Sequence, residues 1–179
     1  MKTNGYRTAL GGLLSAFSVA IMLFGSLLPF ATYVVPVVSS VTIVYFCIEY
    51  SRKHAISVYI VIAILSLFFV PDKEIAFMFT FVFGPYPMLK SIYELKMKRS
   101  LCFFLKVLTF NCEILFTYFL LLKVLVSSVL VTEFMGYSSI VLGGILLLGN
   151  ITFVIYDVAL TRVISLYINR IRPHITKKR

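Results

Sequence analysis

The sequence predicts an all-α integral membrane protein, built as a bundle of six transmembrane helices with both termini in the cytoplasm. Of its 179 residues, 60% are hydrophobic and only 13% are charged, whereas soluble domains have about 25% charged residues. The apolar residues form six runs, and the basic residues gather at the ends of these runs, where they orient a membrane protein. We therefore expect one six-helix domain over residues 1–172 and a basic cytoplasmic tail over residues 173–179.

The six apolar runs give the expected transmembrane spans in chain order. They cover residues 10–30, 34–50, 55–70, 75–93, 102–122 and 138–160. The first run follows a short basic leader, a pattern that also describes a signal peptide. Because this run has about 20 residues, the length that crosses a bilayer, and because further spans follow it, we interpret it as an uncleaved first helix.

The fourth span is interrupted by an unusual motif, Gly84-Pro85-Tyr86-Pro87, with Lys90 one turn later. Proline removes a backbone donor and clashes with the carbonyl one turn back, so the motif predicts a bent helix. In hydrocarbon, a carbonyl that loses its donor needs another partner in the protein or in trapped water. We therefore expect the other helices to surround this bend.

The orientation follows from the distribution of lysine and arginine. With the N-terminus inside, six spans return the C-terminus to the same side, and fifteen basic residues then face the cytoplasm. These are Lys2, Arg7, Arg52, Lys53, Lys90, Lys96, Lys98, Arg99, Lys106, Arg162, Arg170, Arg172, Lys177, Lys178 and Arg179. Only Lys73 and Lys123 remain outside, which is a strong positive-inside bias.

Several classes of function are disfavoured. The net charge of +10 does not indicate a nucleic-acid partner, because no segment is long enough to build a soluble basic face. The three cysteines, Cys47, Cys102 and Cys112, lack the paired spacing of a zinc site and are expected to be small apolar fillers. No catalytic motif of a hydrolase, metalloprotease or nucleotide-binding enzyme is found. We expect no enzyme, metal site or cofactor.

Polar residues within the last two spans are the candidates for a binding site. Glu113 lies about 16 Å into its helix at 1.5 Å per residue, near the middle of the membrane, where Asn111 and Asn150 could meet it. Thr117 lies one turn further on the same helix face, and Tyr86 belongs to the bend of the fourth span. Intramembrane ionisable residues suggest a substrate or proton site. The alternative is a structural polar staple between three helices.

A second polar layer is expected nearer the cytoplasm. Lys90, Lys106 and Asp157 reach a similar depth from the fourth, fifth and sixth spans. A pair between Asp157 and either lysine would cancel charge there. We treat these three residues as an inner polar cluster.

The first span carries small residues at every fourth position: Gly12, Ala16 and Ala20. Such a stripe lies on one helix face and lets another helix approach closely. One interpretation is ordinary packing within the bundle. The other is a docking surface for a partner membrane protein.

With six helices, both ends inside and this small-residue face on the first helix, the chain resembles the substrate-binding S component of energy-coupling factor transporters. The resemblance implies that Gly12, Ala16 and Ala20 dock on a transmembrane coupling protein driven by a pair of ATPases. It also implies a small-molecule ligand, usually a vitamin or metal ion, bound within the bundle, and a multi-pass location in a bacterial cell membrane. The alternative is a membrane scaffold or regulatory subunit that transports nothing. In both cases the lipid bilayer is the surrounding medium.

Overall fold

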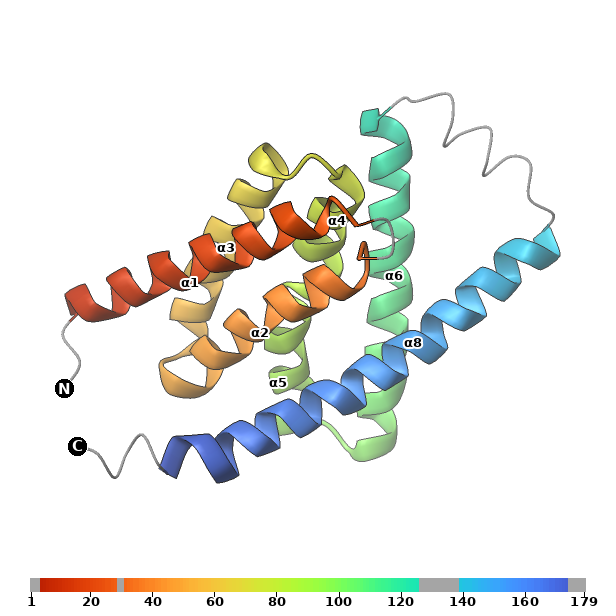
Figure 1. Ribbon diagram of the computed structural model, residues 1–179. Helices are drawn as coiled ribbons and strands as arrows, with labels where there is room; N and C mark the ends of the chain where they lie inside the picture. Colours follow the sequence, from red (N-terminus) through yellow and green to blue (C-terminus); the bar gives the residue numbers. More distant parts are fainter. Residues whose placement is uncertain (1–3, 29–30, 126–138, 174–179) are drawn as a thin grey trace. The chain divides into compact units, whose positions relative to one another are not determined.

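The computed structural model describes residues 4–28, 31–125 and 139–173, and nearly all of them are helical. The chain divides into two compact units, Met1–Val131 and Thr132–Arg179. Figure 1 shows the helices of both units. In chain order the elements are α1 (Asn4–Gly25), α2 (Val34–Glu49), α3 (Arg52–Phe69), α4 (Lys73–Met78), the π-helix η1 (Phe79–Phe83), α5 (Tyr86–Lys96), α6 (Arg99–Leu125), α8 (Ser139–Leu166) and the π-helix η2 (Tyr167–Ile171).

The all-α class is therefore confirmed. Among the described residues, five helical stretches are long and apolar enough to cross a membrane: Gly5–Gly25, Arg52–Phe69, Lys73–Lys96, Arg99–Lys123 and Gly143–Arg170. The sixth, Val34–Glu49, is apolar but shorter. This set of helices is compatible with a multi-pass membrane protein. Of the predicted basic tail, only Pro173 lies within the described residues.

The first helix begins and ends earlier than its predicted span of 10–30. It starts at Asn4 and stops at Gly25, where the chain turns through hydrogen bonds such as Leu28 N–H to Gly25 O, 2.9 Å. A Cβ atom at Gly25 would collide with the side chain of Val35. Glycine thus allows the end of α1 to approach the start of α2, an approach that apolar patterning does not reveal.

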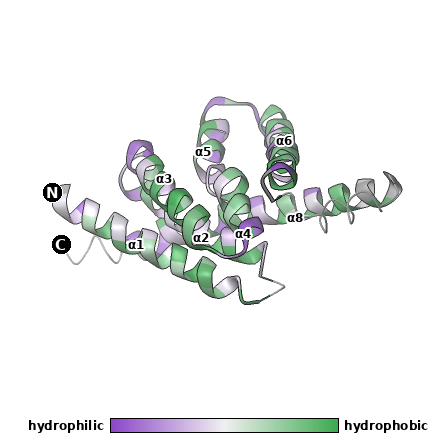
Figure 2. Cartoon of the chain, turned by 90° about the horizontal axis from the view of Figure 1, so that it is seen from above, coloured by the Kyte–Doolittle hydropathy of each residue, from purple (hydrophilic) through white to green (hydrophobic). Residues whose placement is uncertain are grey.

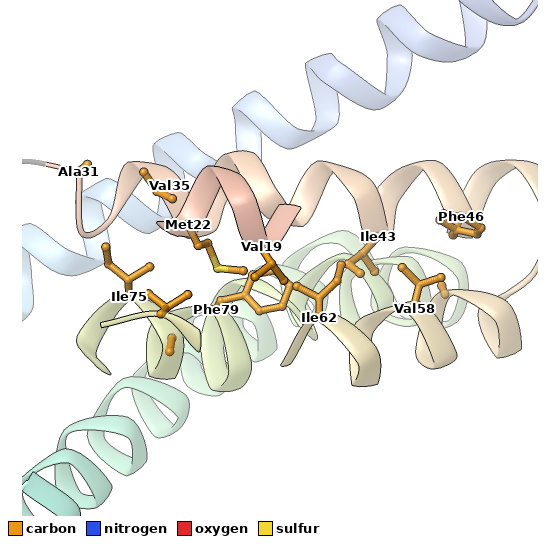
Figure 3. Packing of buried hydrophobic residues seen from close by; sticks show 13 residues of the cluster. Val19, Met22, Ala31, Val35, Ile43, Phe46, Val58, Ile62, Ile75 and Phe79 are labelled. Atoms are coloured by element: carbon orange, nitrogen blue, oxygen red, sulfur yellow. The ribbon is translucent and has the colours of Figure 1, made fainter. Parts of the chain in front are cut away.

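The core of the first unit lies where α1, α2 and α3 pack on one another and on the α4–η1 segment. Figure 3 shows Met22, Ile62 and Phe79 turned toward this common core. Buried serines line the contact between α1 and α2, where Ser18 Oγ lies 2.8 Å from Thr42 Oγ1 and Ser39 Oγ donates to Ser18 O at 3.2 Å. Small residues let apolar helices approach closely in membrane bundles.

At one end of this unit, a polar clasp joins three elements. The hydroxyl groups of Tyr33 and Tyr118 both donate to Glu74 Oε1, at 3.2 Å and 3.0 Å, and lie 2.9 Å from each other. Burial raises the pKa of the Tyr33 phenol, which keeps it protonated as a donor. Tyr33 lies just before α2, Glu74 lies in the first turn of α4, and Tyr118 lies near the end of α6. These three helix ends therefore meet.

The opposite helix ends also meet. The Arg7 guanidinium of α1 lies 5.7 Å from the ring centroid of Tyr50, just after α2. Arg52, at the start of α3, donates to Ser91 O of α5 at 3.5 Å. The successive segments of this unit therefore run in alternating directions, as expected of chain segments that cross a bilayer in turn.

The outer faces of the helices are strongly apolar. Large exposed side chains include Leu13, Phe17, Phe24, Ile64, Phe68, Phe103, Phe104, Leu115, Phe116 and Phe119. Figure 2 shows hydrophobic colour along much of the helix length and hydrophilic residues at helix ends, such as the turn between α5 and α6. Soluble proteins rarely expose apolar patches of this extent, whereas lipid-facing helices do.

Candidate functional site

The bend of the fourth span begins with a change in backbone hydrogen bonding. Gly84 N–H donates to Phe79 O at 2.8 Å, five residues back, and this bond closes the π-helix η1. The next residue, Pro85, has no N–H to offer the carbonyl of Thr80. Instead, the Tyr59 hydroxyl of α3 donates to Thr80 O at 2.6 Å. The expected replacement partner for a freed carbonyl is thus a tyrosine from a neighbouring helix.

This tyrosine contact requires glycine at position 84. A Cβ atom there would lie 2.6 Å from the Phe79 carbonyl oxygen and 2.8 Å from Cε2 of the Tyr59 ring. Neither distance is tolerated by ordinary contacts, and the Phe79 oxygen belongs to the backbone. Because Gly84 has no Cβ atom, the Tyr59 ring can pack directly against the backbone of the π-helix at this position.

Helix α6 packs against η1 and brings an acidic residue to this region. The rings of Phe81 and Phe116 meet edge to face with centroids 5.4 Å apart. Glu113 lies three residues before Phe116 on α6, and its Oε2 atom is buried. Glu113 thus belongs to a helix that packs on η1, and its part in a binding site stays a prediction.

Two oxygen atoms in this region are buried without a hydrogen-bond partner: Glu113 Oε2 and Thr80 Oγ1. Thr80 is 7% exposed. Thr117, which is fully buried, donates its hydroxyl to Glu113 O at 2.7 Å. We call Tyr59, Thr80, Glu113 and Thr117, four oxygen-bearing residues on the packed segments α3, η1 and α6, the interior oxygen cluster. Buried polar atoms without partners are rare and often mark sites where something else binds.

Sequence reasoning found Glu113 and Thr117 but missed Tyr59 and Thr80. The motif at Gly84-Pro85 predicts a freed carbonyl, but in a regular helix this would be Phe81, four residues before the proline; only the π-helix shifts it to Thr80. The motif does not point to Tyr59, which reaches the bend only through the packing of α3 on η1. Hydropathy treats both missed residues as ordinary members of apolar helices.

The other predicted binding residues lie in different settings. The Asn111 amide donates to Val107 O and the Asn150 amide to Leu146 O, both at 2.8 Å and both one turn back on their own helices. Tyr86 is buried in the first turn of α5. Asn150 belongs to the second unit, so its predicted meeting with Glu113 stays a prediction.

The inner polar cluster is partly rearranged. Lys90 Nζ and Lys106 Nζ both contact Glu94 Oε1, at 3.1 Å and 2.7 Å, and both lysines are buried. The predicted fourth span ends at residue 93, but α5 continues to Lys96, and Glu94 on this extension contacts Lys106 of α6. Asp157 lies on α8 in the second unit, and its pairing with either lysine stays a prediction.

The small-residue stripe on α1 faces outward in the first unit. Gly12 and Ala16 are exposed, Ala20 is half-buried, and a Cβ atom built at Gly12 meets nothing within 4 Å. The inward face uses neighbouring positions, among them Ser15 and Ser18. Packing within this unit is therefore not the role of Gly12 and Ala16.

Within residues 4–28, 31–125 and 139–173, no three His, Cys, Asp or Glu side chains are grouped as metal ligands, and the three cysteines are free. Comparison of the chain with protein-family models, with curated proteins and with solved structures finds no match. The class that the fold defines is an all-α protein of long apolar helices. Its function must be argued from the site itself.

Proposed function

We propose that the chain is a six-span membrane protein with both termini in the cytoplasm, and that it is the substrate-binding subunit of a small-molecule uptake transporter. The alternating helix directions of the first unit support this topology. Eight of its described basic residues lie toward the helix ends where Arg7 meets Tyr50: Arg7, Arg52, Lys53, Lys90, Lys96, Lys98, Arg99 and Lys106. Lys73 and Lys123 lie toward the other end, beside the polar clasp.

The single observation that supports substrate binding is the interior oxygen cluster. A carboxylate oxygen and a hydroxyl oxygen are buried without partners beside a π-helix, a distortion that recurs at functional sites. A purely structural staple would use these oxygens in hydrogen bonds between helices, because an unpartnered buried polar group costs stability. A carboxyl oxygen and a hydroxyl oxygen without partners are groups to which a polar solute could hydrogen-bond.

The exposed stripe on α1 supports a second part of the proposal, docking on a partner membrane protein. Gly12 and Ala16 offer a surface on which another helix could lie close to the backbone. By resemblance, that partner would be the coupling protein of an energy-coupling factor transporter with its ATPase subunits. The same stripe would also serve the alternative function, a scaffold that binds a partner and transports nothing.

The decisive experiment compares what the purified protein retains. Wild-type protein and the Glu113→Gln variant are purified in mild detergent, unfolded, and their released small molecules are identified by mass spectrometry. We expect a solute in the wild-type sample that is absent or strongly reduced in Glu113→Gln. Glu74→Gln is the matched control, because it makes the same chemical change in the polar clasp at the helix ends.

The control should retain the solute as wild type does. Equal retention by wild type and Glu113→Gln would contradict a role of the interior oxygen cluster in binding. A wild-type protein that releases no solute and still binds a partner through α1 would favour the scaffold.

A further inference from the structure

We infer that the end of the first unit opposite the polar clasp binds the phosphate headgroups of anionic phospholipids. This inference goes beyond the proposed function, because it applies to a transporter subunit and to a scaffold alike. The surface concerned carries five exposed basic residues, which we call the basic rim: Arg52, Lys53, Lys96, Lys98 and Arg99.

The basic rim is formed by two turns of the chain, one before α3 and one between α5 and α6. Arg52, at the start of α3, donates through Nη2 to Ser91 O of α5 at 3.5 Å. The start of α6 is joined to α5 where Lys106 Nζ lies 2.7 Å from Glu94 Oε1. Both turns therefore belong to the same end of the unit, and Figure 2 shows hydrophilic colour at the turn between α5 and α6.

The two ends of the first unit differ strongly in charge. At the end with the polar clasp, two described acidic residues balance two described basic residues: Asp72, Glu74, Lys73 and Lys123. At the other end, the eight described basic residues named under the proposed function face two described acidic residues, Glu49 and Glu94. This end therefore has an excess of six positive charges over the acidic side chains that the structure describes there.

The members of the basic rim have no acidic partner in the described part of the chain. Glu94 is engaged by Lys90 and Lys106, both of which are buried. Within residues 4–28, 31–125 and 139–173, no member of the basic rim forms a salt bridge. Their exposed ammonium and guanidinium groups are donors of the kind that bind phosphate oxygens through charge-assisted hydrogen bonds.

Exposed apolar side chains beside these cations favour a lipid over a soluble anion. Leu95, Met97 and Leu101 are all exposed, Leu95 by 75%, and they alternate along the chain with the basic residues of the turn between α5 and α6. A phospholipid matches this pattern, because its phosphate meets the basic groups while its acyl chains contact the apolar ones. Each basic residue beside an anionic membrane surface strengthens binding by a factor of about five.

The test measures phospholipid binding through the thermal stability of the full chain in mild detergent. A ligand that binds only the folded state raises the melting temperature in a saturating manner. Wild type is titrated with phosphatidylglycerol and, separately, with phosphatidylcholine that has the same acyl chains. We expect phosphatidylglycerol to bind at least about tenfold more tightly. This preference should shrink in about 0.5 M sodium chloride, because salt screens exposed charges.

The double variant Lys98→Gln/Arg99→Gln removes two charges of the basic rim and should weaken phosphatidylglycerol binding by at least about tenfold. Lys73→Gln/Lys123→Gln is the matched control, because it removes the same charge at the end with the polar clasp, and it should keep the wild-type affinity. Lys53→Gln, on α3, should weaken binding by about fivefold. The melting temperature of each variant without added lipid shows whether it folds.

Equal stabilisation by the two phospholipids would overturn the inference, and so would an equal loss of affinity in the two double variants. Glycerol 3-phosphate carries the phosphate group without acyl chains. If it stabilised the protein as strongly as phosphatidylglycerol at the same concentration, the occupant would be a soluble anion and the inference would fail. None of these outcomes depends on solute retention by Glu113, so this inference and the proposed function can fail separately.

Discussion

At the scale of single residues, Gly84 affects both the backbone geometry and the candidate site. Both depend on this position having no side chain. The glycine lets Tyr59 lie against the π-helix, and Tyr59 then supplies the donor that Pro85 withholds from Thr80 O. A freed carbonyl in an apolar helix must be satisfied within the protein. Pro85 removes a backbone donor, and Tyr59 replaces it. Gly84 makes the room that Tyr59 needs to do so.

Gly84→Ala should destabilise the protein. The added methyl group would press on the Phe79 carbonyl and the Tyr59 ring, and overpacking of this kind costs about 1–3 kcal/mol. We expect a lower melting temperature in detergent and weaker solute retention, because the displaced tyrosine also lines the interior oxygen cluster. Gly12→Ala is the control: its methyl group meets nothing within 4 Å, so its stability should equal or slightly exceed that of wild type. Equal stability of the two variants would contradict the close packing at Gly84.

At the scale of helices, α6 is held to the rest of the first unit by polar contacts at both ends and by rings between them. Glu94 binds Lys106 near the start of α6, and Glu74 binds Tyr118 near its end. Phe116 packs on Phe81 between these points. The part of α6 that carries Glu113 is thus held against its neighbours by contacts that lie both earlier and later along the helix.

Glu94→Gln should loosen the inner attachment of α6. The substitution removes the negative charge that Lys90 and Lys106 share. Breaking a fully buried pair costs about 3–5 kcal/mol, but the Glu94 side chain is 45% exposed, so we expect a loss of about 1–2 kcal/mol in unfolding free energy. Glu74→Gln is the comparison, because glutamine keeps an acceptor for the two uncharged tyrosine donors. A smaller loss for Glu94→Gln than for Glu74→Gln would show that the shared charge is unimportant.

The outward stripe of α1 makes a prediction about association. Ala16→Leu adds bulk where a partner helix would lie close to the backbone, so it should abolish co-purification with the proposed partner membrane protein while leaving the melting temperature unchanged. Phe17→Ala, a change at an exposed residue about 100° around α1 from Ala16, should leave co-purification intact. Unchanged co-purification of Ala16→Leu would place the docking surface elsewhere.

Much of the fold follows from composition and periodicity, because lipid-facing helices must be apolar over a fixed length. The ends of α1 and α5 do not follow, since Gly25 and Glu94 are placed by contacts with distant residues, Val35 and Lys106. The candidate site divides in the same way. Glu113 is conspicuous because a carboxylate in an apolar run is costly, whereas Tyr59 and Thr80 become notable only when η1 brings them together.

At the scale of the whole molecule, the number of membrane crossings decides whether the substrate-binding proposal is tenable. In a background lacking Cys47, Cys102 and Cys112, single cysteines can be introduced at polar helix ends and probed in intact cells with a membrane-impermeant maleimide. With the proposed orientation, we expect Lys73→Cys to react from outside and Lys98→Cys to react only after permeabilisation. Both expectations follow from the excess of basic residues at the inner end.

Arg170→Cys extends the same measurement to the second unit. With six crossings, the end of η2 lies in the cytoplasm beside the same leaflet as the N-terminus, so this variant should be protected in intact cells as Lys98→Cys is. Labelling of Arg170→Cys from outside would mean that the chain crosses the bilayer an odd number of times. The two termini would then lie on opposite sides, and both the resemblance to S components and the docking geometry inferred from it would be lost.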